Sequence, residues 1–353
     1  RCTIIKSWLG RLVMAGKSDE PQNWFMSAVG DATDFDPDST APGASVWGSK
    51  SESIGEISDP IIAIAPSIDN RLIFSTSNYI YAMTGDPLWD GTQLVSISTE
   101  VGFIGPDAWC YGPNRVLYFM GPNGLYALAP NEFNITQTNR LSSGKLDKTF
   151  KDLDLSSSAC KLVYDNVNHG VHIFLTPANQ STDKRSHYFY DSRTNSFWPM
   201  EYPGVIGPTY VMDFQSPNPE ANKILLGGFD GHIRSFSSSA QDDDGTIIDS
   251  HVWIGPISLS STQEVKLTEM LAILDEQTPG LSYEVYAADT VEQAKSGTPI
   301  FSGRWNGGRN NYVRTRARGA AIFIKLLDGT KQDPWAMERL AATLAVAGRA
   351  RIR

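Results

Sequence analysis

The hydrophobic residues of this chain occur in short runs that are separated by polar turns. Up to about residue 260 these runs are rich in β-branched and aromatic residues and are bounded by Gly, Asn, Asp and Pro. Such runs are typical of β-strands, whereas the spacing of an amphipathic helix is nearly absent from this region. The pattern therefore predicts an all-β fold.

A strand–turn–strand unit recurs along the first part of the chain. Each copy joins an apolar strand through a tight polar turn to a strand with aromatic residues, and the copies lie at residues 11–31, 71–86, 115–131, 171–191 and 224–239. Further apolar runs flank them at residues 61–66, 93–98, 108–112, 161–165 and 195–200. Repeats at this spacing, with about four strands each, are typical of β-propeller blades. We therefore expect a β-propeller of about five four-stranded blades over residues 1–250.

The pattern changes after residue 250. Alternating strands are predicted at residues 265–274, 281–288, 312–319 and 321–327, and this pattern over about 100 residues favours a β-sandwich that covers residues 251–353. Residues 289–297 fit either a short surface helix or a loop. Residues 334–346 fit either a helix or a final strand of the sandwich.

The composition is that of a globular chain with two domains. The length is 353 residues and the hydrophobic content is 41%. No apolar run reaches the ~18 residues of a membrane-spanning helix and no secretory signal opens the chain, so we expect no membrane span.

Because the first residue is Arg1, we expect a processed or partial product. Three cysteines without ligand spacing cannot form a disulfide framework and indicate free thiols.

Charge is unevenly distributed along the chain. Residues 250–353 hold 13 basic and 10 acidic side chains, whereas residues 1–249 hold 17 basic and 29 acidic ones. A basic end on an acidic body is expected to meet an acidic partner. The strongest local signal there is a set of arginines: Arg304, Arg309, Arg314, Arg316 and Arg318. The last three share one face of a strand, which can bind nucleic-acid phosphates or, in the interpretation that we favour, the acidic surface of another subunit.

Motifs that mark catalytic sites are missing from the sequence. Neither the G-x-S-x-G elbow of serine hydrolases, nor a nucleotide-binding glycine loop, nor H-E-x-x-H, nor C-x-x-C occurs. We therefore predict a protein without enzymatic activity, without a cofactor and without a resident metal. A glycosidase would need two carboxylates that converge at one mouth of the propeller.

Two further groups of residues have both a structural and a functional interpretation. Asp242, Asp243 and Asp244 precede a glycine and suit a hard cation such as calcium, although a solvated linker is the interpretation that we favour. Several tryptophans recur near the predicted blade edges, where packing between blades is favoured over stacking on carbohydrate. They are Trp24, Trp47, Trp89, Trp109 and Trp198.

Several phrases of the sequence resemble those of a known class of proteins. They are NRLIFSTSNYIYAMTGDP (70–87), VGFIGPDAW (101–109), NRVLYFMGPNGLYAL (114–128), RTNSFWP (193–199) and GRWNGGRNNYVRTRARG (303–319). Together they resemble the propeller-type structural proteins of tailed-bacteriophage virions, which serve as hub, nozzle or adaptor components of the neck and tail.

The resemblance implies a structural, non-enzymatic virion protein that assembles as a ring around the DNA channel. Its partners would be other copies of itself, neighbouring neck and tail proteins and, transiently, the genomic DNA during ejection. The alternative that we keep is a carbohydrate- or receptor-binding propeller at a phage tail tip or on a cell surface. A ring component needs self-complementary side surfaces, whereas a receptor-binding protein needs an exposed aromatic pocket.

Overall fold

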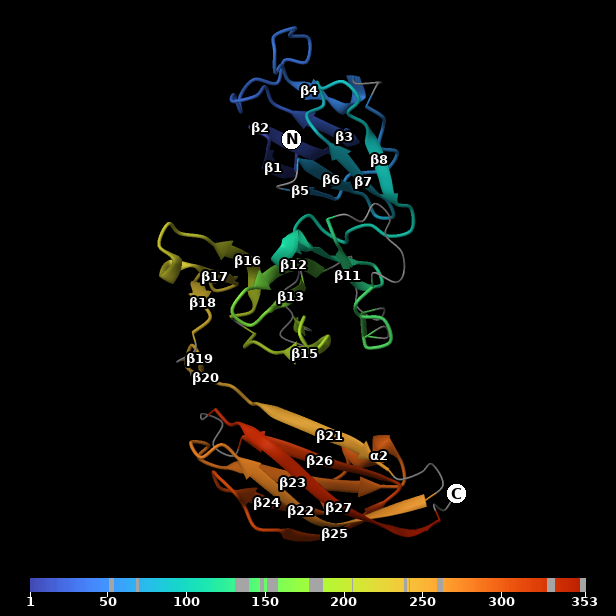
Figure 1. The fold of residues 1–353 in the computed structure, drawn as a ribbon, viewed down its shortest axis with the longest axis vertical. Helices are drawn as coiled ribbons and strands as arrows, with labels where there is room; N and C mark the ends of the chain where they lie inside the picture. The colour runs from blue at the N-terminus through green and yellow to red at the C-terminus, as the bar shows by residue number, and fades with distance from the viewer. Residues whose placement is uncertain are drawn as a thin grey trace. The chain divides into compact units, whose positions relative to one another are not determined.

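β-Strands make up nearly all of the regular structure in the computed structural model (Figure 1). It describes residues 1–50, 54–67, 70–130, 140–146, 149–150, 158–177, 187–204, 206–237, 240, 242–258, 263–328 and 334–349. The chain divides into two units, Arg1–Phe236 and Ser237–Arg353. The division thus comes earlier than the predicted boundary at residue 250, because the short hairpin of β19 (Asp242–Asp243) and β20 (Thr246–Ile247) belongs to the second unit.

The first unit contains, among its described residues, five antiparallel sheets that follow one another along the chain. The first two are β1 (Ile4–Trp8), β2 (Arg11–Lys17), β3 (Glu20–Met26) and β4 (Val46–Trp47), then β5 (Ala63–Pro66), β6 (Arg71–Ser75), β7 (Ile80–Thr84) and β8 (Leu94–Ser98). The third is β9 (Trp109–Tyr111), β10 (Leu117–Gly121) and β11 (Gly124–Leu128). The last two are β12 (Ser158–Asp165), β13 (Gly170–Pro177), β14 (His187–Asp191) and β15 (Ser196–Met200), then β16 (Pro208–Phe214), β17 (Lys223–Gly228) and β18 (Ile233–Ser235).

Each predicted hairpin forms the second and third strands of one of these sheets. Residues 71–86, for example, hold β6 and β7, and residues 115–131 hold β10 and β11. The flanking runs are also strands, since residues 61–66 hold β5 and residues 93–98 hold β8. In the described residues the third and fifth sheets have three strands instead of the predicted four. Short 3-10 helices are η1 (Gly48–Lys50), η2 (Pro113–Arg115) and η4 (Pro219–Ala221).

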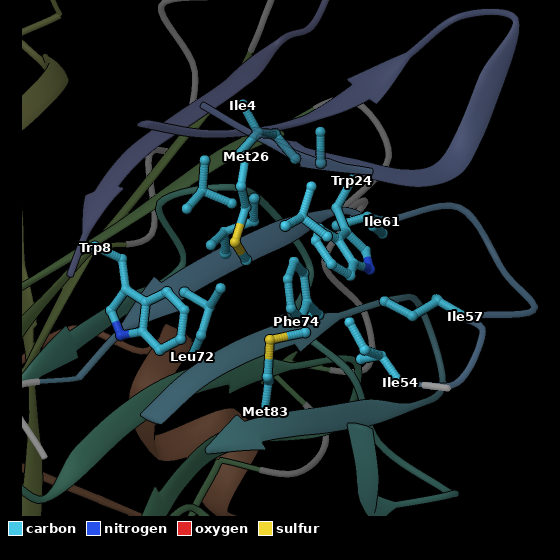
Figure 2. Close-up of a cluster of buried hydrophobic side chains, with 14 residues drawn as sticks. Ile4, Trp8, Trp24, Met26, Ile54, Ile57, Ile61, Leu72, Phe74 and Met83 are labelled. Carbon is cyan, nitrogen blue, oxygen red and sulfur yellow. The ribbon is translucent and has the colours of Figure 1, made fainter. Parts of the chain in front are cut away.

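The first two sheets enclose a cluster of buried side chains. Figure 2 shows Trp24 and Met26 of β3 together with Leu72 and Phe74 of β6 and Met83 of β7. The rings of Trp24 and Phe74 lie 5.7 Å apart between their centroids. Burial of such large apolar side chains is the main favourable term in folding, so this cluster holds the two sheets together.

Similar clusters join each later sheet to the sheet before it. Their members include Ile73 and Phe119, Leu125 and Leu162, and Val163 and Val211. Within the described residues no buried cluster joins the fifth sheet to the first. One face of the fifth sheet is accordingly exposed, and Tyr210, Met212 and Phe214 of β16 lie on it.

A buried ion pair also links the first two sheets. The Arg11 side chain in β2 is fully buried, and its Nε and Nη2 donate to the two carboxylate oxygens of Asp86 at 2.8 and 3.2 Å. Its Nη1 donates to the carbonyl oxygens of Ser27 and Ala44 at 2.7 and 2.6 Å. Because nearly every N–H of this guanidinium has an acceptor, the cost of burying its charge is offset.

The second unit is a β-sandwich with a single small helix among its described residues. One sheet has the order β21 (His251–Ile257), β26 (Ala321–Asp328), β23 (Leu281–Ala288) and β24 (Phe301–Trp305), and the other has β25 (Val313–Gly319), β22 (Gln263–Leu274) and β27 (Met337–Arg349). A common core, with Leu267 and Ala317 from one sheet and Ile324 and Trp305 from the other, lies between them. The predicted sandwich is thus present.

Two ambiguous segments of the second unit are resolved by the structure. Residues 289–297 contain the helix α2 (Val291–Ser296), whose first turn is capped by the hydroxyl of Thr290 accepting from the main-chain N–H of Gln293. Residues 334–346 belong mostly to the strand β27. None of the described helices has the length and apolar character needed to cross a membrane.

Substitution of Asp86 tests the role of the buried ion pair. Asp86→Ala leaves the Arg11 guanidinium buried without its counter-ion, and we expect a loss of about 3–5 kcal/mol in the free energy of unfolding, measured by urea titration. Asp90→Ala, at an exposed position of the same segment, is the control and should change it by less than about 0.5 kcal/mol. Equal effects of the two substitutions would contradict this account.

Candidate functional site

A pocket of ≈ 590 Å³ lies in the first unit where the first strands of four sheets approach one another. Its walls come from β1, from β9 and the turn before it, from β12 and from β16. Charged side chains and aromatic rings are prominent in its lining. They include Lys6, Asp107, Lys161, Trp109, Tyr111 and Tyr210.

One carboxylate in this pocket binds two lysines from different sheets. Lys6 Nζ of β1 lies 3.1 Å from Asp107 Oδ1, and Lys161 Nζ of β12 donates to Asp107 Oδ2. The Asp107 and Lys6 side chains are each 27% exposed and that of Lys161 is 16% exposed, so the three groups are partly shielded from water. Ion pairs in this setting are screened less by salt than pairs on an open surface.

The two lysines keep Asp107 ionised. Burial alone would raise the pKa of the carboxyl, but the hydrogen bond and charge of Lys161, followed by the charge and hydrogen bond of Lys6, outweigh it. The net result is a pKa below the usual value of an aspartate. Asp107 is therefore a hydrogen-bond acceptor at neutral pH and is poorly suited to donate a proton.

Each lysine also lies over an aromatic ring. Lys6 Nζ is 5.3 Å from the centroid of Trp109, and Lys161 Nζ is 4.6 Å from that of Tyr210. Tyr111 meets Trp109 edge to face, with centroids 5.6 Å apart and an interplanar angle of 74°. Cation–π contacts of this kind hold the rings and the ammonium groups in fixed positions relative to one another.

Successive side chains of β9 and β12 lie on opposite faces of their sheets, so the neighbours of Trp109 and Lys161 are buried in the core. Cys110 follows Trp109 in β9 and is buried in the core between the third and fourth sheets. Leu162 follows Lys161 in β12 and is buried in the same core. The main-chain N–H of Leu162 donates to the carbonyl oxygen of Asp107 at 3.2 Å, which fixes the turn before β9 against β12.

Further polar groups complete the wall of the pocket. Asn166, Asp213 and Gln215 line it, and Gln215 Nε2 donates to Asp213 Oδ2 at 3.0 Å. Aromatic rings beside fixed donors and acceptors can hold a ligand that has both apolar faces and hydroxyl groups. The arrangement is therefore chemically suited to binding a polyhydroxylated molecule.

The predicted arginine cluster is split between the two sheets of the sandwich. Arg314, Arg316 and Arg318 alternate along β25 and are exposed, with buried residues between them, as the sequence pattern predicts. Arg304 lies in β24 of the other sheet, and Arg309 lies in the connection between these strands. The five arginines therefore do not form one continuous ladder.

Two arginines of β25 have carboxylate partners within the chain. Arg318 Nε donates to Glu264 Oε2 at 2.6 Å, and Arg314 Nε lies 3.5 Å from Glu269 Oε1. Both glutamates belong to the neighbouring strand β22. The positive charge that this face offers to another molecule is therefore smaller than the sequence alone indicates.

The predicted cation site forms part of a tight hairpin. Asp242 and Asp243 lie in β19, and Asp244 and Gly245 form the turn with positive φ angles of 52° and 86°. The side chain of Asp242 accepts from the main-chain N–H of Gly245 at 2.9 Å. Across the described residues no group of three His, Cys, Asp or Glu side chains could hold a metal ion, so the structure gives the calcium interpretation no support.

The tryptophans singled out from the sequence lie in different environments. Trp24 is buried in the cluster between the first two sheets, whereas Trp89 and Trp198 are 58% and 50% exposed. Only Trp109, of the five singled out from the sequence, lines the pocket. The cysteines are free, and burial raises the pKa of the Cys110 and Cys160 thiols.

Sequence reasoning missed the charged part of the site. Lys6, Asp107 and Lys161 are far apart in the chain, and neither lysine belongs to a motif. The available signal was their position, since each lies in or just before the first strand of a repeated sheet.

No family model matches the chain, and no curated protein matches it. Several solved structures do, at low similarity. An exo-β-1,3-galactanase from Phanerochaete chrysosporium shares 9% identity over 96% of this chain and 95% of its own, with a TM-score of 0.32. PorZ, a bacterial surface component of the type-IX secretion system of Porphyromonas gingivalis, shares 12% identity over 98% of this chain, with a TM-score of 0.36. This chain spans 44% of the length of PorZ.

The comparisons correct the expectation that the chain is not an enzyme. The galactanase and a further match, a glycoside hydrolase with 10% identity over 96% of this chain and 83% of its own and a TM-score of 0.25, are both carbohydrate-cleaving proteins. With such low TM-scores these likenesses assign no reaction to this chain.

The Asp107 ion pairs predict a pH-dependent effect of Asp107→Asn. Because the folded carboxyl has the lower pKa, its contribution to stability is fully present above the unfolded value of about 4 and is lost as the pH falls through the folded value. The variant should therefore unfold at a lower temperature than the original protein at pH 7, and the difference should shrink in acid. Calorimetry at both pH values measures it, with Asp90→Asn as the exposed control. A difference that is unchanged in acid would contradict the account.

Proposed function

We propose that the first unit binds carbohydrate in the pocket formed by β1, β9, β12 and β16. The observation that carries this proposal is the pairing of aromatic rings with fixed charged groups, Trp109 with Lys6 and Tyr210 with Lys161. The apolar faces of a sugar ring pack on aromatic side chains, and its hydroxyl groups need donors and acceptors at fixed positions. Both requirements are met by groups that line this pocket.

The proposal includes a propeller arrangement of the five sheets, with the pocket near the central axis. It is supported by the order of the sheets along the chain and by the presence of the first strands of four of them, β1, β9, β12 and β16, at one pocket. Central positions of this kind are where propellers bind ligands, because loops and inner strands from several blades meet there.

Each residue has a distinct role in the proposed site. Trp109 and Tyr210 supply the packing surfaces, and Lys6 and Lys161 donate hydrogen bonds to sugar hydroxyls or ring oxygens. Asp107 accepts hydrogen bonds and keeps both ammonium groups in place. Because Trp109 and Tyr210 supply the packing surfaces, loss of either aromatic ring should weaken carbohydrate binding directly.

A glycan array followed by calorimetric titration tests the proposal. The oligosaccharide with the strongest array signal is titrated into the original protein and into Trp109→Ala and Tyr210→Ala. We expect each variant to bind it about tenfold more weakly, because the lost packing on a sugar face is worth about 1 kcal/mol or more. Trp198→Ala, which removes a half-exposed ring outside the pocket, is the control and should bind as the original does.

Two results would overturn carbohydrate binding at this site. One is the absence of any array signal, and the other is unchanged affinity in Trp109→Ala. Mass spectrometry of the oligosaccharide after incubation shows in the same experiment whether it is cleaved.

A second proposal is a structural role in a tailed-phage virion, as a hub, nozzle or adaptor ring. The observation that favours it is the row of exposed arginines on β25, which suits a contact with an acidic subunit surface. Arg316, at the centre of the row, lies between the two arginines that pair with Glu264 and Glu269.

Replacement of Arg314, Arg316 and Arg318 by glutamate tests the virion proposal. The triple variant should be missing from purified phage particles, measured by mass spectrometry, because the charge reversal makes the contact repulsive. Lys295→Glu, at an exposed position of α2, is the control and should be incorporated. Normal incorporation of the triple variant contradicts a contact role, and so does duplex DNA binding by the original monomer that the variant loses.

A further inference from the structure

The strand β27 forms an unprotected edge of the sandwich. It is 13 residues long and lies at the end of the sheet with the order β25-β22-β27. Within the described part of the chain no strand pairs with its outer side. An edge strand presents a row of unpaired N–H and C=O groups, and proteins normally block such rows to prevent association.

The other three edge strands of the sandwich have features that prevent pairing with a further strand. β21 carries Pro256 within an irregularity of its pairing, and β24 is only five residues long. β25 exposes charged arginines. Between Leu340 and Gly348, by contrast, β27 has no proline and no charged residue. This edge is thus the one that is open to pairing with another strand.

The backbone groups that face outward can be assigned from one hydrogen bond. The hydroxyl of Thr268 in β22 donates to the carbonyl oxygen of Thr343 at 3.0 Å, so the polar backbone groups of Thr343 face β22. In an antiparallel pair these groups alternate in direction along the strand. Those of Ala342 and Leu344 therefore face away from the sheet, as do those of Leu340 and Val346.

The side chains of the same residues lie on the inner face of the sheet. Leu340 and Val346 lie opposite Ala272 and Val265 of β22, which are both fully buried in the core of the sandwich. Val346 is nonetheless 58% exposed, because nothing in the described chain covers the outer side of this edge. A strand added there would extend the apolar core.

We propose that two copies of this chain pair through β27, antiparallel to each other, around a two-fold axis at Thr343. In this register Ala342 of one copy lies opposite Leu344 of the other, and Leu340 lies opposite Val346. These pairs are the ones whose backbone groups face outward, so they form roughly eight hydrogen bonds between the copies. Their side chains also share one face, which makes the inner surfaces of the two sheets continuous.

A second copy fits this edge better than a different partner. The pairing is self-complementary, since the same residues meet in both directions and no like charges are brought together between Leu340 and Val346. The stretch has no charge that would select an acidic or basic peptide. A two-fold contact also closes on itself and stops at a dimer. The proposal is independent of carbohydrate binding, because it concerns the second unit alone.

Ala342→Pro is the most selective variant for this edge. Proline removes the outward N–H of residue 342 and leaves the pairing groups that face β22 in place. Val346→Lys, which places a charge in the contact, is a second variant. Ala342→Ser retains the N–H and is the matched control, and Ile300→Lys adds the same charge at another exposed apolar position of the second unit.

Sedimentation velocity of the full chain at about 1 to 100 µM measures the association. We expect the original protein, Ala342→Ser and Ile300→Lys to form a dimer in proportion to concentration. Ala342→Pro and Val346→Lys should raise the dissociation constant at least about tenfold, with the circular dichroism spectrum unchanged. A monomer at every concentration, open-ended oligomers, or an unchanged dimer in both folded variants would overturn the proposal.

Discussion

Sheets that are apolar on both faces impose the main constraint on the first unit. In β6 every residue is buried, and its side chains alternate between two cores: Leu72 and Phe74 face the first sheet, and Ile73 faces the third. A small sheet of this kind cannot cover both of its own faces, so it must lie between two neighbours. The serial order of the five sheets follows from this requirement.

The pocket is a consequence of the same stacking. The first strands of four of the five sheets line it, so polar side chains on or beside those strands meet residues that are distant in sequence. Asp107 thereby binds Lys6 from the first sheet and Lys161 from the fourth. The buried pair of Arg11 and Asp86 fixes the first sheet on the second, so both ionic contacts depend on sheet packing and also reinforce it.

Local patterns predicted the strands well because hairpins are encoded by neighbouring residues. The same patterns could not predict the pocket, since its charged residues come from different sheets and have no characteristic spacing.

Two features of the second unit depend on contacts between strands. The sequence of residues 334–346 is ambiguous because Ala and Leu favour a helix locally, whereas pairing with β22 makes this segment a strand. Arg304 was grouped with Arg314 because they are close in sequence, although they lie in different sheets.

A crystal structure of the protein with its strongest-binding oligosaccharide is the most direct test of carbohydrate binding by this pocket. The account predicts a sugar ring packed against Trp109 or Tyr210, with its hydroxyl groups within hydrogen-bonding distance of Lys6, Asp107 or Lys161. An oligosaccharide bound elsewhere on the chain, with no sugar in this pocket at a saturating concentration, would contradict it.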